Sequence, residues 1–102
     1  MSEYRYTAVS WPQKASDLIA GAGLPVRSGK ASEGLLWIAY GVPVIASTKV
    51  DPAGLMDTLR PIRDGRPGFA IVPRRGHPPE RAYWITEATV GVEMIKRLGF
   101  GV

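Results

Sequence analysis

Glycine and proline interrupt this chain so often that long regular elements cannot form in it. The 102 residues include 12 glycines and nine prolines, more than an average protein carries. Glycine commonly ends helices, and proline disrupts helix interiors and central strands. The pattern therefore predicts short elements joined by many turns. A chain of this length also predicts one domain with one hydrophobic core.

The residue types that are rare or absent exclude several kinds of site. The chain has no cysteine, which rules out disulfides, thiol catalysis and cysteine-ligated zinc or iron–sulfur centres. A single histidine is too few for a multi-histidine metal site. We therefore expect neither a metal nor a cofactor.

Apolar residues are spread too thinly for a membrane segment. The longest apolar stretches, such as residues 35–40, are far shorter than a membrane span. The first residues, MSEYRYTAVSW, lack the charged-then-apolar order of a signal peptide. We expect a cytoplasmic protein with no membrane partner.

Positive charge is concentrated in one stretch of the sequence. Residues 60–81 contain six arginines but only Asp64 and Glu80 as acids, and this segment accounts for the whole net charge of +4. Guanidinium groups bind phosphates and carboxylates in a bidentate fork, so arginine without lysine favours recognition of such anions. A solvated basic loop without a partner is the plainer interpretation of the same cluster.

A strong helix signal begins at Asp51 and Pro52. Asp51 can accept hydrogen bonds from the amides of a first turn, and proline loses nothing at the first helical position. Apolar residues then recur at helical spacing as far as residue 62, which predicts one buried face. Pro61 removes an internal hydrogen bond, so we expect the helix to bend or end near Arg60.

The N-terminal half predicts a mixture of short elements. Residues 4–10 are expected to form a strand or an extended arm, and a weak helix runs from Pro12 to the glycines at 21 and 23. Another helix is expected to follow Ser28 or Ser32 and to end at Gly41. Residues 42–50 fit either a strand or a very short helix.

The C-terminal part predicts a hairpin followed by a helix. Residues 69–72 and 81–85 are expected to be its strands, joined by a loop with three prolines and a glycine in nine residues. Thr86 is placed to cap a last helix over residues 87–98, with acidic and basic side chains at the ends that match the helix dipole.

The order of these elements resembles the winged helix-turn-helix family over residues 30–98. IASTKVDPAGLMDTLRPIRDG is similar to the helix-turn-helix core, and FAIVPRRGHPPERAYWITEAT is similar to the wing, whose second strand often closes on a pattern like YWITEAT. The resemblance implies an α+β fold with three to four helices and a small antiparallel β-hairpin wing. It leaves residues 1–28 as an N-terminal extension within a single domain.

The usual partner of that family is double-stranded DNA, so the resemblance implies a non-enzymatic DNA-binding protein that regulates transcription. The recognition helix, residues 52–62, would enter the major groove, and the basic wing, residues 66–82, would reach a neighbouring groove or its phosphates. A symmetric dimer on two half-sites would raise the affinity. The expected DNA-binding residues are Lys49, Ala53, Gly54, Thr58, Arg60, Arg63, Arg66, Arg74, Arg75 and Arg81.

Other interpretations of the same face stay open. A winged-helix-like adaptor or inhibitor could use it to bind an acidic protein surface, because a fold does not fix a function. Gly54, Asp57 and Pro61 make a poor base-reading helix, which favours this alternative.

Individual residues in the basic stretch also have alternative roles. Arg60 and Arg63 could pair with Asp57 and Asp64 at helical spacing instead of contacting phosphates. A nuclease-like site would require His77 as a base, with Glu80 and Arg81 nearby.

Overall fold

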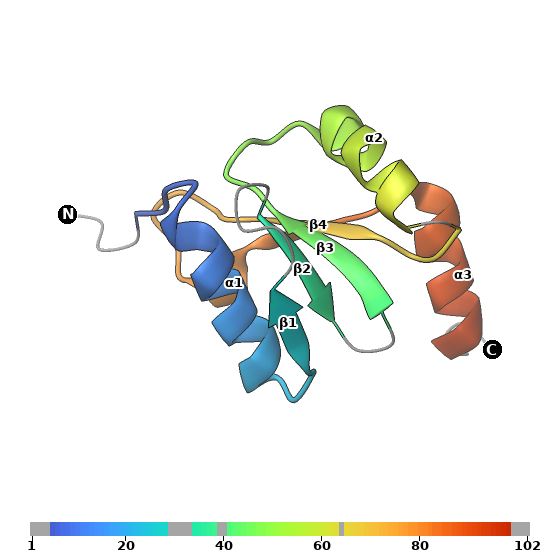
Figure 1. The fold of residues 1–102 in the computed structure, drawn as a ribbon, viewed down its shortest axis with the longest axis horizontal. Coiled ribbons are helices and arrows are strands. Elements are labelled where there is room, and N and C mark those ends of the chain that lie inside the picture. The colour runs from blue at the N-terminus through green and yellow to red at the C-terminus, as the bar shows by residue number, and fades with distance from the viewer. Residues whose placement is uncertain (1–4, 29–33, 39–40, 64, 99–102) are drawn as a thin grey trace.

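Three helices and a five-stranded sheet make up the α+β fold seen in a computed structural model, which describes residues 5–28, 34–38, 41–63 and 65–98 (Figure 1). The elements are as short as the glycines and prolines predict. In chain order they are α1 (Ser10–Gly21), β1 (Val26–Ser28), β2 (Leu35–Ile38), β3 (Val42–Ala46), α2 (Pro52–Arg63), β4 (Phe69–Val72), the 3₁₀ helix η3 (Pro79–Arg81), β5 (Tyr83–Ile85) and α3 (Ala88–Leu98).

The strands lie in the sheet in the order in which they occur in the chain. Neighbouring strands are antiparallel, except that β3 and β4 are parallel, with Val44 opposite Phe69 and Ala46 opposite Ile71. Helix α2 makes the crossover that a parallel pair requires. Because β3 and β4 run the same way, both carboxyl ends lie at one end of the sheet.

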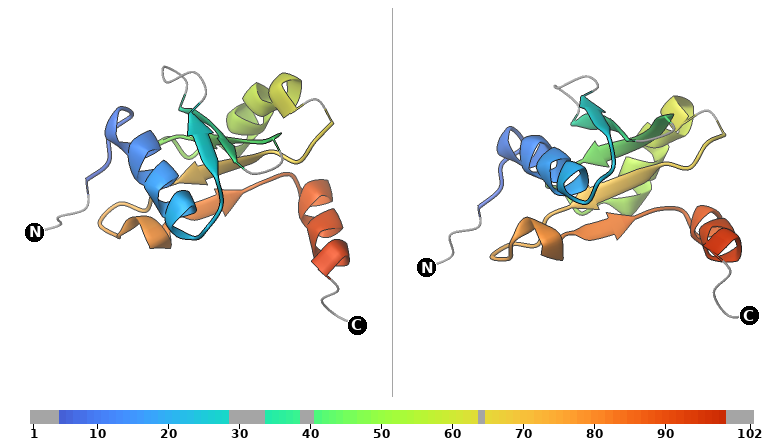
Figure 2. Two further views of the ribbon diagram at one scale, coloured as in Figure 1. Left: turned by 60° about the horizontal axis from the view of Figure 1, so that its bottom comes forward. Right: turned by 90° about the horizontal axis from the view of Figure 1, so that it is seen from below.

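The sheet is covered by a helix on each face. Along β3, Val44 and Ala46 pack with α1, whereas Ile45 packs with α2, as the alternation of strand side chains requires. The right-hand view of Figure 2 has α1 in front of the sheet and α2 behind it. Residues 10–28, which the sequence pattern sets apart as an extension, form α1 and β1 of this same unit.

Trp11 anchors α1 to the sheet. Its side chain is fully buried, and its indole Nε1 donates a hydrogen bond of 3.0 Å to the carbonyl oxygen of Ile71 in β4. The Tyr6 ring meets it edge-on at 4.9 Å. Just before the helix, the backbone amides of Thr7 and Ser10 donate reciprocally to each other's hydroxyl oxygens, as in a capping box.

Helix α3 is attached more loosely than α1 and α2. None of its side chains over residues 88–97 is fully buried; Val90 and Met94 are half-buried against the cluster on the α1 side. Val92 and Ile95 are 51% and 54% exposed. Just before the helix begins, Glu87 forms a part-buried ion pair of 2.6 Å with Arg63 at the end of α2.

The helix predicted after Ser28 or Ser32 is wrong where the structure describes it, because residues 35–38 form strand β2. Leu35 packs toward α2 and Leu36 toward α1, so both faces of the strand are buried. A strand buried on both faces is apolar at successive positions, which resembles a broad helical stripe. Ala39 and Tyr40 lie outside the described residues.

Strand β3 also occupies the place of the first helix of a helix-turn-helix. Residues 42–46 pair with β2 and β4, so the segment directly before the turn into α2 is a strand and not a helix. The antiparallel hairpin predicted over residues 69–85 is present as β4 and β5, but it belongs to a five-stranded sheet and not to a separate small wing.

Two further local predictions are wrong in part, because residues 5–9 form no strand and helix α2 does not end near Arg60. Residues 5–9 are irregular or turn, and α1 begins at Ser10, because the Thr7–Ser10 hydrogen bonds favour a helix start. Helix α2 continues past Pro61 to Arg63. Proline in the last turn loses one hydrogen bond, while Ile62 still packs against the cluster beneath α2.

Candidate nucleic-acid interface

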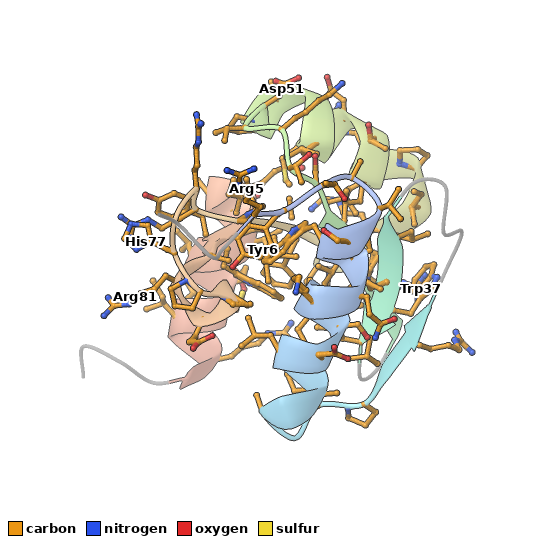
Figure 3. All side chains as sticks on the ribbon, turned by 90° about the vertical axis from the view of Figure 1, so that its left-hand side faces the viewer. Arg5, Tyr6, Trp37, Asp51, His77 and Arg81 are labelled. Carbon is orange, nitrogen blue, oxygen red and sulfur yellow. The ribbon has the colours of Figure 1, made fainter. Side chains whose placement is uncertain are left out.

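The carboxyl ends of β3 and β4 bring three segments together. The loop after β3, residues 47–51, and the loop after β4, residues 73–82, leave the same end of the sheet, and residues 5–9 lie against them (Figures 1 and 3). We call these three segments the carboxyl-end face. It contains five cationic side chains and only two carboxylates, Asp51 and Glu80; the cations are Arg5, Lys49, Arg74, Arg75 and Arg81.

The loop over residues 73–82 has a defined shape despite its prolines. The Tyr6 hydroxyl donates a 2.5 Å hydrogen bond to the carbonyl oxygen of His77, whose own amide donates to the Arg74 carbonyl at 3.0 Å. Gly76 supplies the positive φ of +78° that this turn needs. The guanidinium of Arg74 lies 5.3 Å from the centre of the Tyr83 ring, within cation–π range. Arg75 and Arg81 are exposed beside it.

The start of α2 is held by its cap. Asp51 accepts a 3.2 Å hydrogen bond from the Gly54 amide, as the sequence predicts. A Cβ on Gly54 would lie 2.2 Å from the Asp51 carboxylate, so the absence of a side chain keeps this cap in place. Thr58 donates its hydroxyl to the Gly54 carbonyl at 2.9 Å. Ala53 and Lys49 are the exposed residues on either side of the cap.

A hollow of about 250 Å³ lies between the end of β3 and α2. Its polar lining comes from Ser47, Thr48, Lys49 and Thr58, and Leu55 is among its apolar residues. Hydroxyl, ammonium and backbone N–H donors of this kind commonly contact phosphate oxygens.

The expected DNA-binding residues divide into two groups in the structure. Lys49, Ala53, Arg74, Arg75 and Arg81 lie at the carboxyl-end face or directly beside it, with Gly54 and Thr58 in the first turns of α2.

The second group has other partners. Arg60 forms an exposed ion pair of 3.2 Å with Asp57, which is the structural alternative raised by their spacing. Arg63 pairs with Glu87, and Asp64, its other candidate partner, lies outside the described residues. Arg66 donates its Nε–H to the Arg63 carbonyl and lies 5.5 Å from the centre of the Trp37 ring. Arg63 and Arg66 thus belong to the opposite end of α2.

Arg5 and Tyr6 are members of the face that no local sequence signal marks. The Tyr6–His77 hydrogen bond joins positions 71 residues apart, so only the fold brings the N-terminal segment to the loop. The aromatic pair Tyr6 and Trp11 was the available hint, because two large aromatic residues beside a helix start imply an anchored segment.

The residues that a nuclease-like site would require are not joined to one another in the described part of the chain. No hydrogen bond or ion pair joins the side chains of His77, Glu80 and Arg81 there. The same residues contain no group of three histidine or acidic side chains arranged to hold a metal ion. None of the helices described is both long and apolar enough to cross a membrane.

Comparisons with known proteins do not connect the chain to a family. No protein-family model matches it, and neither a curated protein nor a solved structure matches it.

Proposed function

We propose that this protein binds double-stranded DNA through the carboxyl-end face, without catalysing a reaction. The observation that carries the proposal is that the loop over residues 73–82 and the start of α2 lie at one end of the sheet, with Arg5 beside them (Figure 3). These are the two elements to which the winged-helix resemblance would assign DNA contact. Their cations can therefore engage one stretch of backbone together.

The character of the face favours phosphate contacts over base contacts. Arginine dominates its cations, and a guanidinium matches phosphate geometry in a bidentate way. The first turn of α2 offers only small exposed side chains, and Gly54 and Thr58 are engaged within the helix. Binding through a handful of phosphates is largely independent of sequence and is driven by counterion release.

The proposal keeps the partner implied by the winged-helix resemblance and both of its contact elements, but it does not require a helix-turn-helix. Strand β3 takes the place of the first helix and delivers the chain to α2. A protein that occupies DNA in this way can regulate transcription in the cytoplasm by excluding other proteins. A second copy on a neighbouring half-site would increase the number of phosphate contacts.

Replacing both Arg74 and Arg75 with alanine should flatten the salt dependence of DNA binding. Each lost phosphate contact reduces the slope of log K against log salt by about 0.9, so we expect a decrease of about 1.8. The measurement is fluorescence anisotropy of a short labelled duplex of mixed sequence, titrated at several salt concentrations.

The matched control replaces Arg27 and Lys96, two exposed cations outside the face, with alanine. This pair removes the same charge but should leave the slope nearly unchanged, because salt screens distant charges. The proposal fails if the native protein does not retain DNA at low salt, or if both pairs reduce the slope equally.

Val50 favours a second candidate function, the binding of an acidic protein surface. This residue is 71% exposed beside Lys49, so an apolar side chain lies among the cations of the face. Protein interfaces combine such apolar anchors with arginine, whereas a valine side chain cannot form a hydrogen bond or an ion pair with a phosphate. A partner that remains bound after nuclease treatment, and that is lost on Val50→Asp, would favour this candidate over DNA.

A further inference from the structure

A second cavity lies at the end of β4 opposite the carboxyl-end face. It measures about 400 Å³, within the range of small-molecule sites in proteins. Pro67 on its rim precedes β4, whereas the loop over residues 73–82 follows that strand. In Figure 1, α3 and the α2–β4 connection lie on the right, and the loop over residues 73–82 lies on the left.

The apolar wall of this cavity is incompletely packed. It comes from Pro67 and from Val90 and Met94 of α3, which among the described residues of this helix are the ones packed against the core. Neither is fully buried, so both retain surface that a ligand could cover. Methionine adapts its shape to irregular partners, which suits a wall of this kind.

The polar rim of the cavity carries positive charge that described residues do not neutralise. Arg63 is already paired with Glu87, and Glu93 is paired with Lys96. Arg66 and Arg97 have no ion pair within the described segments.

Arg66 is also held in position. Its Nε–H donates to the Arg63 carbonyl oxygen at 3.1 Å, and its guanidinium lies over the Trp37 ring. The hydrogen bond and the ring contact restrict the Arg66 side chain before any ligand arrives, which lowers the entropy that binding would cost.

We propose that this cavity binds a small amphipathic organic anion. A carboxylate or sulfonate head group would pair with Arg66 and Arg97, and an aromatic or aliphatic body would cover Met94 and Val90. Such a ligand is complementary to the cavity, because its charged head would lie beside a guanidinium fork and its apolar body would lie on an apolar wall. This inference does not depend on DNA binding, because the cavity shares no residue with the carboxyl-end face.

The test is a titration of the full chain with 8-anilinonaphthalene-1-sulfonate, whose fluorescence rises in apolar sites. We expect saturable binding of one molecule per chain. Unlabelled 1-naphthoate should displace the probe, whereas the neutral 1-naphthalenemethanol should displace it at least about tenfold less well, the usual value of one charge-assisted contact. This comparison uses only the native protein.

Variants then locate the site. Arg66→Glu with Arg97→Glu should weaken probe binding at least about tenfold. Arg27→Glu with Arg60→Glu changes the net charge equally outside the cavity and should leave binding unchanged. Circular dichroism and thermal melting establish that each double variant is folded.

Several results would overturn the proposal. These are an absence of saturable binding, equal displacement by the acid and the alcohol, or equal weakening by both charge pairs. Loss of binding on Val92→Ser with Ile95→Ser, while the cavity variants bind normally, would place the probe on the exposed side of α3. The double variant Arg74→Ala with Arg75→Ala should still bind the probe. This result would distinguish the test of the cavity from the test of DNA binding.

Discussion

Replacement of Trp11 by alanine is expected to lower the free energy of unfolding by about 4 kcal/mol. The side chain is fully buried between α1 and the sheet, beside Phe69 and Ile71, and its removal leaves a large cavity. It also removes the donor to the Ile71 carbonyl. Since the free energy of unfolding of domains of this size is only about 5–15 kcal/mol, Trp11→Ala should remove a large part of it.

Chemical denaturation of the two proteins measures this difference, and Trp11→Phe is the matched control. Phenylalanine retains most of the apolar volume but has no N–H. The Ile71 carbonyl keeps its hydrogen bond from the Ser47 amide, so we expect a loss of only about 1–2 kcal/mol. A loss below about 1 kcal/mol for alanine would show that α1 contributes little to the core.

Gly34→Ala is expected to destabilise the fold by about 3 kcal/mol or more. A Cβ at this position would lie 2.4 Å from the carbonyl oxygen of Ala46, and the φ of +66° is unfavourable for alanine. The obstructing atom is backbone, so it cannot move aside without shifting β3. Such a shift would strain the 2.8 Å hydrogen bond from the Ala46 amide to the Gly34 carbonyl.

Gly65 provides a control that separates the clash from the backbone strain. Its φ is +77°, similar to that of Gly34, but nothing lies within 4 Å of the Cβ it would gain. Gly65→Ala should therefore cost only about 1–2 kcal/mol, from the left-handed conformation alone. Equal melting temperatures for the two variants in a thermal denaturation series would contradict the close approach of Gly34 to β3.

Local signals were sufficient to predict the helices at 52–63 and 88–98 and the strand at 69–72. Each of these elements is marked by residues of its own segment. Asp51 and Pro52 mark the start of α2, and Thr86 precedes α3. Strand β2 could not be recognised in this way, because its apolar residues serve two helices on opposite faces. The helix-turn-helix interpretation depended on that segment and on residues 42–46, and the structure does not confirm it there, because both are strands.

The candidate interface could be predicted only in part, for a related reason. The basic loop and the start of α2 were identified from composition and capping, and both lie at the carboxyl-end face. The positions of Arg63 and Arg66 depend on the direction in which α2 and β4 run, which the linear charge pattern does not contain. Arg5 lies at the face because its neighbour Tyr6 is hydrogen-bonded to His77, a residue far along the chain.

The Trp11–Ile71 hydrogen bond has a consequence for how the protein is made. Its two residues are 60 positions apart, and the sheet under α1 also requires the parallel pairing of β3 with β4. A single helix of this length is marginal in water. At a synthesis rate of roughly 5–20 residues per second, β4 is synthesised roughly 3–12 seconds after α1, and the apolar side of α1 is uncovered during that time. During translation the apolar side of α1 therefore stays uncovered until β4 emerges, so docking of this helix is a late event.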